Sequence, residues 1–295
     1  MEKKHIFTGA ATAIVTPMHD AGVDYDALGR LIDWQVESGI NALVVCATTG
    51  EAPTLTDNDH CKVLEFAIKR SQGRVPIIAG TGSNDTGHAI MMTQYACAIG
   101  ASAVLCVTPY YNKPTQTGLI ASYTAIADAS SVPVILYNVP SRTGTNIEPS
   151  TYNVLADHPN IVAIKEANGR ISKIAETFRL VGDRMDIYSG NDDQIVPILS
   201  LGGRGVISVL ANVCPAQTVE MCDRFFRGDV KGSAELQLKL LPLINALFSQ
   251  TNPIPVKAAL ARMGMIRDQL RLPLTPMEEP FRSKLYEQME ALGLI

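Results

Sequence analysis

Short runs of apolar residues recur along the chain, separated by stretches whose apolar positions have a helical spacing. The runs alternate little with polar residues, which is typical of parallel strands covered on both faces. Eight runs are strand candidates: Thr12–Val15, Ala42–Ala47, Pro76–Ala79, Ala103–Thr108, Pro133–Tyr137, Ile161–Lys165, Met185–Tyr188 and Val206–Leu210. Between them, segments such as Tyr25–Ser38 and Asn58–Ser71 predict helices. Strands that alternate with helices need crossover connections and therefore predict a parallel sheet.

Eight strand–helix units predict an α/β protein with a (β/α)8 barrel, a fold that usually needs about 250 residues. We expect this barrel to form a catalytic domain over residues 1–227. Residues 228–295 contain no comparable strand candidate and predict a small C-terminal all-helical domain, with helices over Val230–Gln250, Pro255–Met263 and Glu278–Leu292.

A doubly wound open sheet is the alternative architecture. Its support is Gly80-Thr81-Gly82, which follows a strand candidate and precedes a helical segment. However, Asp85 stands where a dinucleotide-binding turn would have its third glycine. A tight turn explains these glycines better than a nucleotide site does.

Composition narrows the possible functions. The chain has 25 Lys and Arg against 29 Asp and Glu, so its formal charge of −4 argues against a nucleic-acid partner. The six cysteines form no Cys-x-x-Cys pair, and the five histidines show no metal-ligand spacing, so we expect no metal and a reducing, cytoplasmic location. Residues 89–112 are uncharged, but Gly100 and Pro109 interrupt them, and we expect no membrane span.

Barrel enzymes place their chemistry where strands end and the following loops begin. At these positions the sequence offers hydroxyl groups and glycines, one lysine and no histidine: Thr48, Thr49, Gly80, Tyr110, Tyr111, Tyr137, Arg142, Lys165 and Gly190. This set suits a small carbonyl or carboxylate substrate and a lysine nucleophile better than metal hydrolysis or Ser/His/Asp chemistry. The loops after the last two strand candidates are poor in glycine, which disfavours a phosphorylated substrate.

Lys165 is the strongest single candidate for a catalytic residue. The two-residue period of a strand places Ile161, Ala163 and Lys165 on one face and Glu166 on the other. If the first face points into the barrel, desolvation favours a neutral amine that can attack a ketone and form a Schiff base. The alternative is an ion pair with Glu166, but adjacent strand residues face opposite ways.

Tyr137 ends the preceding strand candidate, so it should emerge beside Lys165 and could move protons during carbinolamine and enamine chemistry. A packing role remains an alternative for this tyrosine. Thr48 and Thr49 offer hydroxyls and loop amides for a carboxylate, with helix capping as the alternative. Arg142 could clamp a second carboxylate, although many exposed arginines have no such role.

Several strings together resemble the dihydrodipicolinate synthase family. They are Ala47-Thr-Thr-Gly-Glu51, Val107-Thr-Pro-Tyr-Tyr-Asn112, Leu136-Tyr-Asn-Val-Pro-Ser-Arg-Thr-Gly144, Val162-Ala-Ile-Lys-Glu-Ala167, Gly205-Val-Ile-Ser-Val209 and Asn252-Pro-Ile-Pro-Val-Lys257. The resemblance covers nearly the whole chain. It implies a homotetrameric barrel enzyme, a dimer of tight dimers, of the pyruvate-dependent class I aldolase superfamily. Such a lyase condenses pyruvate with L-aspartate 4-semialdehyde through a Schiff base, without metal or organic cofactor, in diaminopimelate and lysine biosynthesis.

The resemblance also implies a role for each matching residue. Four would be catalytic: Lys165 as the Schiff-base lysine, Tyr137 as acid and base, and Thr48 as the link between Tyr137 and a neighbouring subunit's Tyr111. Four would bind substrate: Thr49 the pyruvate carboxylate, Arg142 the semialdehyde, and the backbones of Gly190 and Ile207 the region of the Schiff base.

Two other functions fit part of this pattern. N-acetylneuraminate lyases and 2-keto-3-deoxy sugar-acid aldolases share the lysine and the Tyr-x-x-Pro turn, but the pairs Thr48-Thr49 and Tyr110-Tyr111 and the position of Arg142 favour the synthase. A non-catalytic keto-acid sensor would be expected to lack a relay residue, and none is missing.

In lysine-sensitive members of the resembled family, an effector site corresponds to residues between Ala52 and Tyr110 here. His60, Asn84 and Tyr110 match that site, but His88 replaces a glutamate, and Pro53 and Asp57 are also changed. We therefore expect weak or absent inhibition by lysine.

Overall fold

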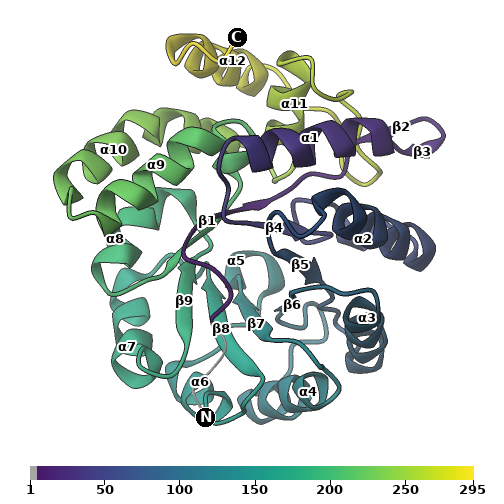
Figure 1. The fold of residues 1–295 in the computed structure, drawn as a ribbon, viewed down its shortest axis with the longest axis vertical. Coiled ribbons are helices and arrows are strands. Elements are labelled where there is room, and N and C mark those ends of the chain that lie inside the picture. Colours follow the sequence, from purple (N-terminus) through teal and green to yellow (C-terminus); the bar gives the residue numbers. More distant parts are fainter. Residues whose placement is uncertain (1–4) are drawn as a thin grey trace.

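Eight parallel strands close into a barrel in which the first strand pairs with the last (Figure 1). The computed structural model describes residues 5–295, so the first four residues of the predicted barrel domain lie outside the described residues. The strand order is β1-β10-β9-β8-β7-β6-β5-β4. The bounds are β1 Gly9–Ala13, β4 Ala42–Val45, β5 Ile77–Gly80, β6 Ala103–Val107, β7 Val134–Asn138, β8 Ile161–Glu166, β9 Asp186–Ser189 and β10 Gly205–Ser208. This order confirms the predicted barrel.

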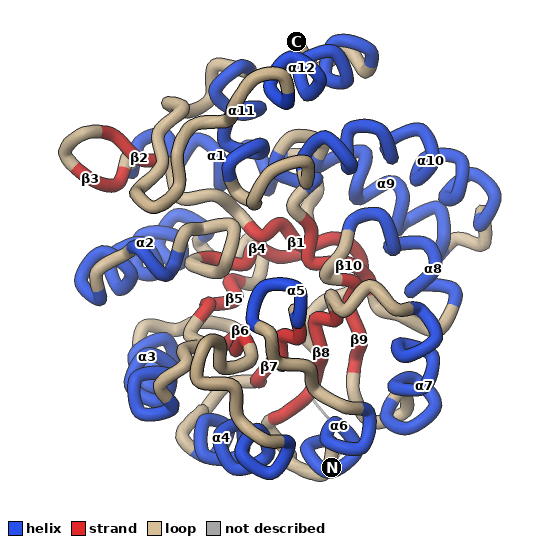
Figure 2. The backbone as a smooth tube through the Cα atoms, turned by 180° about the vertical axis from the view of Figure 1, so that it is seen from behind, coloured by secondary structure: helices blue, strands red, loops and turns tan. Residues whose placement is uncertain are grey.

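Helices surround the barrel, as Figure 2 shows. They are α1 Tyr25–Glu37, α2 Asp57–Ser71, α3 Thr86–Ala98, α4 Gln116–Asp128, α6 Pro149–Leu155, α7 Ile171–Val181, α8 Ile195–Ser200 and α9 Pro215–Phe226, whereas the short α5 Pro140–Thr143 lies in front of the strands in the same view. Short 3-10 turns cover Ala52–Thr54, Asp192–Gln194 and Leu210–Asn212. The helices predicted near residues 25 and 58 are therefore confirmed. Thr56 caps α2 by accepting a hydrogen bond from the Asp59 amide at 3.1 Å.

The barrel closes where β1 meets β10. Gly9 pairs with Gly205, and a Cβ atom on Gly205 would lie only 1.8 Å from the Gly9 carbonyl oxygen. The φ of Gly205, 150°, is also one that residues with a side chain rarely adopt. Only glycine fits this seam.

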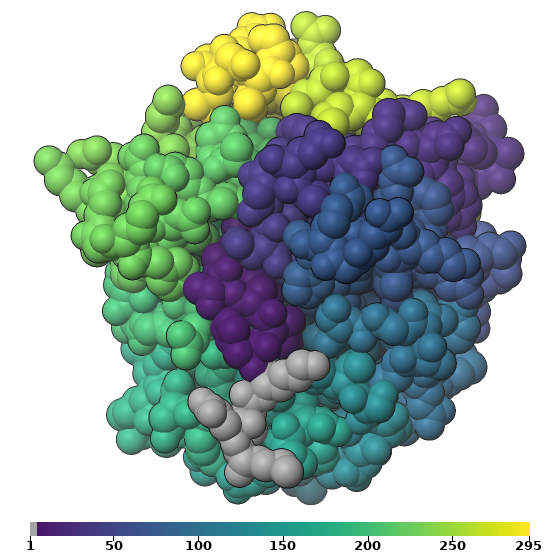
Figure 3. Space-filling view, in the orientation of Figure 1, coloured from purple at the N-terminus to yellow at the C-terminus, as the bar shows by residue number. Residues whose placement is uncertain are grey.

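Small side chains line the barrel interior, and an aromatic pair fills one end. Ala11, Ala42 and Ala163 belong to the inner cluster, which leaves room for Tyr188. Phe7 stacks on Tyr188 with 4.3 Å between ring centroids, and the Tyr188 hydroxyl donates to the Phe7 carbonyl at 2.7 Å. In Figure 3 the first residues that the structure describes, coloured dark purple, lie near the middle of the face turned to the viewer. The amino end of the barrel is thus closed, which leaves its carboxyl end for a site.

A hairpin and a bulge depart from the sequence-based expectations. Strands β2 (Met18–His19) and β3 (Gly22–Val23) form an antiparallel hairpin. The sequence does not predict this hairpin, because two-residue strands leave no periodic signal.

At the start of β8 the register shifts, so Ile161 joins the outer apolar cluster and Val162 the inner one. The predicted inward orientation of Ile161 was therefore wrong, since the alternation holds only from Ala163 onward.

The C-terminal residues are helical, as expected. They form α10 (Val230–Leu247), α11 (Ile254–Arg262) and α12 (Phe281–Ala291), and α11 and α12 lie beyond α1 at one edge of the molecule (Figure 1). Helix α10 packs against α9 of the barrel. The domain boundary at 227/228 stays a prediction.

Candidate active site

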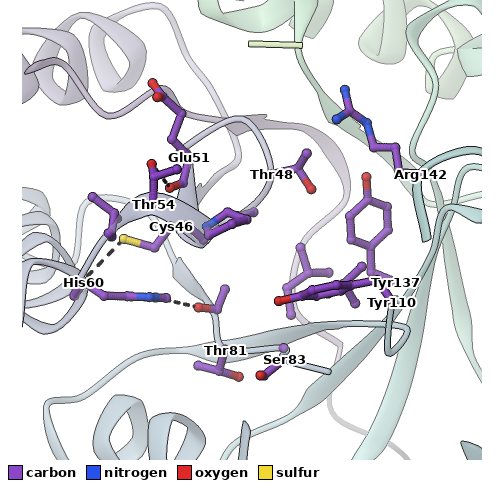
Figure 4. Close-up of a pocket in the computed structure, with 18 of the residues that line it drawn as sticks. Cys46, Thr48, Glu51, Thr54, His60, Thr81, Ser83, Tyr110, Tyr137 and Arg142 are labelled. Atoms are coloured by element: carbon purple, nitrogen blue, oxygen red, sulfur yellow. Dashed lines mark hydrogen bonds between the residues drawn. The ribbon is translucent and has the colours of Figure 1, made fainter. Parts of the chain in front are cut away.

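A cavity of about 530 Å³ opens at the carboxyl ends of β4 to β7. Thr48, Tyr137 and Arg142 lie together at one side of it, and Cys46, Thr54 and His60 lie at the other (Figure 4). Each of the strands β4, β5, β6 and β7 contributes the residues just after its end. The C-terminal part of the chain also lines the cavity, through Thr251, Asn252, Pro253, Pro273 and Leu274.

Lys165 and Tyr137 face each other across neighbouring strands. They occupy paired positions in β8 and β7, and the Lys165 Nζ atom lies 4.3 Å from the centre of the Tyr137 ring. Lys165 is only 3% exposed and is not among the residues that line the cavity, whereas Tyr137 lines it. Among the described residues, no carboxylate comes within ion-pair distance of Lys165. The alternative of a pair with Glu166 is thus excluded here.

Glu166 instead holds the outer side of β7 and β8. Its carboxylate accepts hydrogen bonds from the Asn138 side chain at 3.0 Å, the Tyr152 hydroxyl at 3.0 Å and the Asn168 amide at 2.9 Å. Burial raises the pKa of Glu166 to about 7, although all of these hydrogen bonds favour the charged form. Asn138 also accepts from the Ile147 amide. This cluster therefore fixes the loop that follows β7 and carries Arg142.

The loop after β4 has an unusual backbone. Cys46 and Glu51, with φ of 56° and 55°, occupy the left-handed region without being glycine. Such conformations persist where surrounding contacts impose them, and they gather at functional sites. The Thr16 hydroxyl donates to the Gly50 carbonyl at 2.7 Å, and the Lys257 ammonium binds the Glu51 carboxylate at 2.6 Å. Both anchors come directly after Thr48 and Thr49 and hold the part of the loop that carries these two threonines.

Thr48 and Thr49 face different surroundings. Thr48 lines the cavity, but no hydrogen bond joins it to Tyr137 within the part of the chain that the structure describes. Thr49 is buried and accepts a hydrogen bond from the Asn252 side-chain amide at 3.0 Å. Arg142, on α5 at the cavity mouth, donates to the Asn252 carbonyl oxygen at 3.0 Å.

Neither Gly190 nor Ile207 lines the cavity, and Gly190 lies close to the lysine. The Gly190 amide donates to the Glu166 carbonyl oxygen at 2.8 Å. A Cβ atom on Gly190 would come within 3.2 Å of the Lys165 Cγ atom, so a side chain there would press on the lysine. Ile207 is fully buried on β10, in the inner cluster that also contains Tyr137 and Ala163.

Tyr111 is not brought to the site within one chain. Its side chain is 90% exposed, and its φ is 71°. The loop around it is nevertheless held, since Asn112 donates to the Asn84 carbonyl and Thr145 to the Pro109 carbonyl. The structure thus presents an aromatic ring outward from an ordered loop.

The far part of the cavity contains two histidines. His60 is buried, and one of its ring nitrogens lies 2.8 Å from the Gly80 carbonyl oxygen. Burial lowers its pKa. His88 pairs with Asp57 at 3.0 Å, so two of the residues that depart from the lysine-sensitive pattern contact each other.

Among residues 5–295, no group of three or more His, Cys, Asp or Glu side chains is placed to hold a metal ion. None of the helices in that range is both long and apolar enough to cross a membrane. All six thiols are free, and burial raises the pKa of Cys46 and Cys106. The last finding argues against thiolate chemistry at these two positions.

Known proteins match the chain over nearly its full length. The model of the dihydrodipicolinate synthetase family matches residues 6–292. The chain belongs to this family. A 4-hydroxy-tetrahydrodipicolinate synthase from Lachnoclostridium phytofermentans is 53% identical over 98% of this chain and 99% of that protein.

Two solved structures show the same fold. Dihydrodipicolinate synthase from Thermotoga maritima is 44% identical, with a TM-score of 0.97 over 99% of this chain and 100% of that one. The chloride-inhibited enzyme from Acinetobacter baumannii, solved in complex with pyruvate, is 45% identical, with a TM-score of 0.96 over 98% and 99%. The expected fold, the expected family and the expectation of a lyase of the class I aldolase superfamily are confirmed.

The sequence alone predicts no role at the site for three residues that lie beside it, Asn252, Lys257 and Glu166. Asn252 and Lys257 belong to a string that supports the family resemblance, but the contacts of Asn252 with Thr49 and of Lys257 with Glu51 join positions more than 200 apart in the chain. The sequence predicts no role for Glu166 beyond a possible ion pair with Lys165. A buried lysine and a buried glutamate are rare enough to mark a candidate, but no periodicity shows which charges they meet.

Proposed function

We propose that the chain condenses pyruvate with L-aspartate 4-semialdehyde, as the names of its relatives indicate, through a Schiff base on Lys165 and without metal or organic cofactor. The observation that carries this proposal is the pairing of Lys165 with Tyr137 beside the cavity. It places a nucleophilic amine against the ring of a residue whose hydroxyl group can move protons. Free thiols and small, polar substrates fit a cytoplasmic location.

In the proposed reaction the Lys165 amine attacks the ketone carbon of pyruvate. The resulting carbinolamine loses water to give an imine, and the Tyr137 hydroxyl supplies the proton that the departing oxygen needs. Loss of a methyl proton gives an enamine, whose carbon attacks the aldehyde carbon of the second substrate. The amino group of that substrate then displaces Lys165 from the imine carbon, which closes the ring and frees the enzyme.

Substrate binding is proposed for the four residues that the resemblance named. Thr49 binds the pyruvate carboxylate, and Arg142 at the cavity mouth binds the carboxylate of the semialdehyde, for which a guanidinium is well shaped. The backbones of Gly190 and Ile207 enclose the Schiff base, which the closeness of Gly190 to Lys165 supports.

Assembly is part of this proposal. Tyr111 of a second copy completes a relay with Thr48 and Tyr137, within a homotetramer built from tight dimers. Its 90% exposure on a held loop supports this role, because an exposed ring on a strained backbone is unexplained within one chain. The C-terminal helical unit, residues 228–295, packs on the barrel as a support rather than as a second site.

Borohydride reduction in the presence of pyruvate tests the chemistry. A pyruvyl adduct on Lys165, located by peptide mass spectrometry, is the expected result. Lys257 is the internal control, because it is equally buried but bound to Glu51. No adduct, or an adduct on Lys257, would contradict the proposal. Assays with aspartate semialdehyde against aldoses and N-acetylmannosamine then separate the synthase from the sugar-acid aldolases.

Mixing of two inactive variants tests the assembly. Tyr111→Phe and Lys165→Met subunits, each with little activity, should regain activity when mixed, since one site of each mixed dimer has both residues. Random mixing makes half of the dimers mixed. Absence of any recovery, with mixed dimers shown by native mass spectrometry, would place Tyr111 outside the partner's site.

A further inference from the structure

Asn252 joins two side chains of the proposed site that lie far apart in the sequence. Its side-chain amide donates to the Thr49 hydroxyl oxygen at 3.0 Å, and its backbone carbonyl accepts from the Arg142 guanidinium at 3.0 Å. Asn252 itself lines the cavity and is 5% exposed. The C-terminal segment Asn252–Lys257 therefore reaches into the carboxyl end of the barrel.

The direction of the first hydrogen bond matters for chemistry. A threonine hydroxyl has one proton and can accept as well as donate. Because the Asn252 amide uses the acceptor side of the Thr49 oxygen, the Thr49 proton stays available, and no acceptor for it lies within the described residues. A carboxylate accepts hydrogen bonds only, so it needs such a donor.

The other end of the Asn252 side chain has no partner. Its Oδ1 atom is buried and accepts no hydrogen bond from the residues that the structure describes. A buried acceptor without a partner destabilises the folded protein, so folding alone would favour an apolar residue here. The amide is therefore better explained by what its nitrogen does to Thr49 than by a contribution to stability.

The rest of the segment is rigidly fixed. Five residues further on, the Lys257 ammonium binds the Glu51 carboxylate at 2.6 Å and the Thr16 carbonyl oxygen at 3.0 Å, with no exposed surface on either charged side chain. The segment and the loop after β4 are thus tied at two points, and the Asn252 amide has a fixed place beside Thr49.

We propose that Asn252 is a positioning residue that turns the Thr49 hydroxyl proton toward the pyruvate carboxylate while its backbone carbonyl orients Arg142. The inference rests on the proposed function, because it assigns Thr49 to pyruvate and Arg142 to the second substrate. It predicts that the side chain and the backbone of Asn252 serve different substrates. Changes to the Asn252 side chain should therefore weaken the binding of pyruvate and leave the binding of the semialdehyde unchanged.

Steady-state kinetics of Asn252→Ala separate the role of the Asn252 side chain from that of its backbone carbonyl. The pyruvate KM should rise about tenfold, which is the change expected when binding loses one hydrogen bond. The semialdehyde KM should stay within about twofold, because the backbone carbonyl that orients Arg142 is retained. Asn252→Asp, of the same size, should be worse, since its carboxylate draws the Thr49 proton to itself and repels pyruvate. Equal changes in both KM values, or a normal pyruvate KM in Asn252→Asp, would overturn the proposal.

A double-mutant cycle with Thr49→Val tests whether Asn252 acts through Thr49. In that background Asn252→Ala should change the pyruvate KM no further, whereas a purely structural role would keep its full effect. The pyruvate concentration for half-maximal borohydride trapping gives the same comparison without the second substrate. If the wild type forms no adduct, the proposed function fails. If the wild type forms it and Asn252→Ala has the same half-maximal concentration, only the role of Asn252 fails.

Discussion

Glu51 and Lys257 are 206 positions apart in the chain, yet their side chains form an ion pair with no exposed surface on either partner. The second carboxylate oxygen of Glu51 accepts from the Arg271 amide at 3.1 Å. The pair joins the loop after β4 to α11, and so it joins the barrel to the C-terminal helices.

Loss of one partner of this ion pair should destabilise the protein strongly. Lys257→Met leaves the Glu51 charge buried and unpaired, for which the expected loss in the free energy of unfolding is about 3–5 kcal/mol. Denaturant unfolding at fixed protein concentration measures it. Lys231→Met, which removes an exposed lysine that pairs loosely with Glu235, is the matched control and should change stability by less than about 1 kcal/mol. A loss in Lys257→Met no larger than in the control would show that the pair is not needed for stability.

Glu166 should make stability depend on pH. Burial raises its pKa from 4.5 to about 7 in the folded protein, so the folded state keeps the proton where the unfolded chain has lost it. The stability that the protonated Glu166 contributes is fully present below pH 4.5 and is lost as the pH rises through 7. The free energy of unfolding should fall by about 3 kcal/mol over this range. Glu166→Gln resembles the protonated form and cannot ionise, so its stability should not fall in this way as the pH rises.

Denaturant unfolding of the wild type and Glu166→Gln between pH 5 and 8 checks this expectation. The wild type should lose stability relative to the variant as the pH rises. Parallel pH profiles for the two proteins would mean that Glu166 titrates at its ordinary value in the fold.

Removal of the Tyr137 hydroxyl should slow catalysis without disturbing the fold. Tyr137→Phe keeps the ring that faces the Lys165 Nζ atom but removes the proton-transfer group, so turnover should fall by roughly 10²-fold or more. Tyr286→Phe is the matched control, because Tyr286 lies on α12 away from the cavity and its loss should leave turnover unchanged. Near-normal turnover in Tyr137→Phe would remove Tyr137 from the mechanism.

Free lysine should inhibit weakly or not at all. In the far part of the cavity, His88 binds Asp57, so this carboxylate is already engaged and the imidazole offers no negative charge to a ligand ammonium. Titration with millimolar lysine should change the condensation rate by less than about fivefold, the lower end of typical allosteric couplings. Clear inhibition below one millimolar would show that the His88–Asp57 pair opens to admit the ligand.

The barrel could be predicted from the sequence because each strand is a local apolar run. All eight candidates became strands within a few residues of their predicted bounds. Lys165 and Tyr137 could be paired because both end such runs. The bulge at Ile161 could not be foreseen, since it depends on the register with β7. The contacts of Asn252 and Lys257 also escaped prediction, because periodicity carries no information about partners 200 positions away.

The C-terminal segment has a consequence for the protein while it is being made. Translation completes β10 well before it reaches Asn252 and Lys257, and at about 5–20 residues per second the gap lasts several seconds. During that time the carboxylate of Glu51 has no lysine to bind, and the loop that carries Thr48 and Thr49 lacks one of its anchors. A nascent chain on the ribosome therefore has every strand of its barrel before it has a working site.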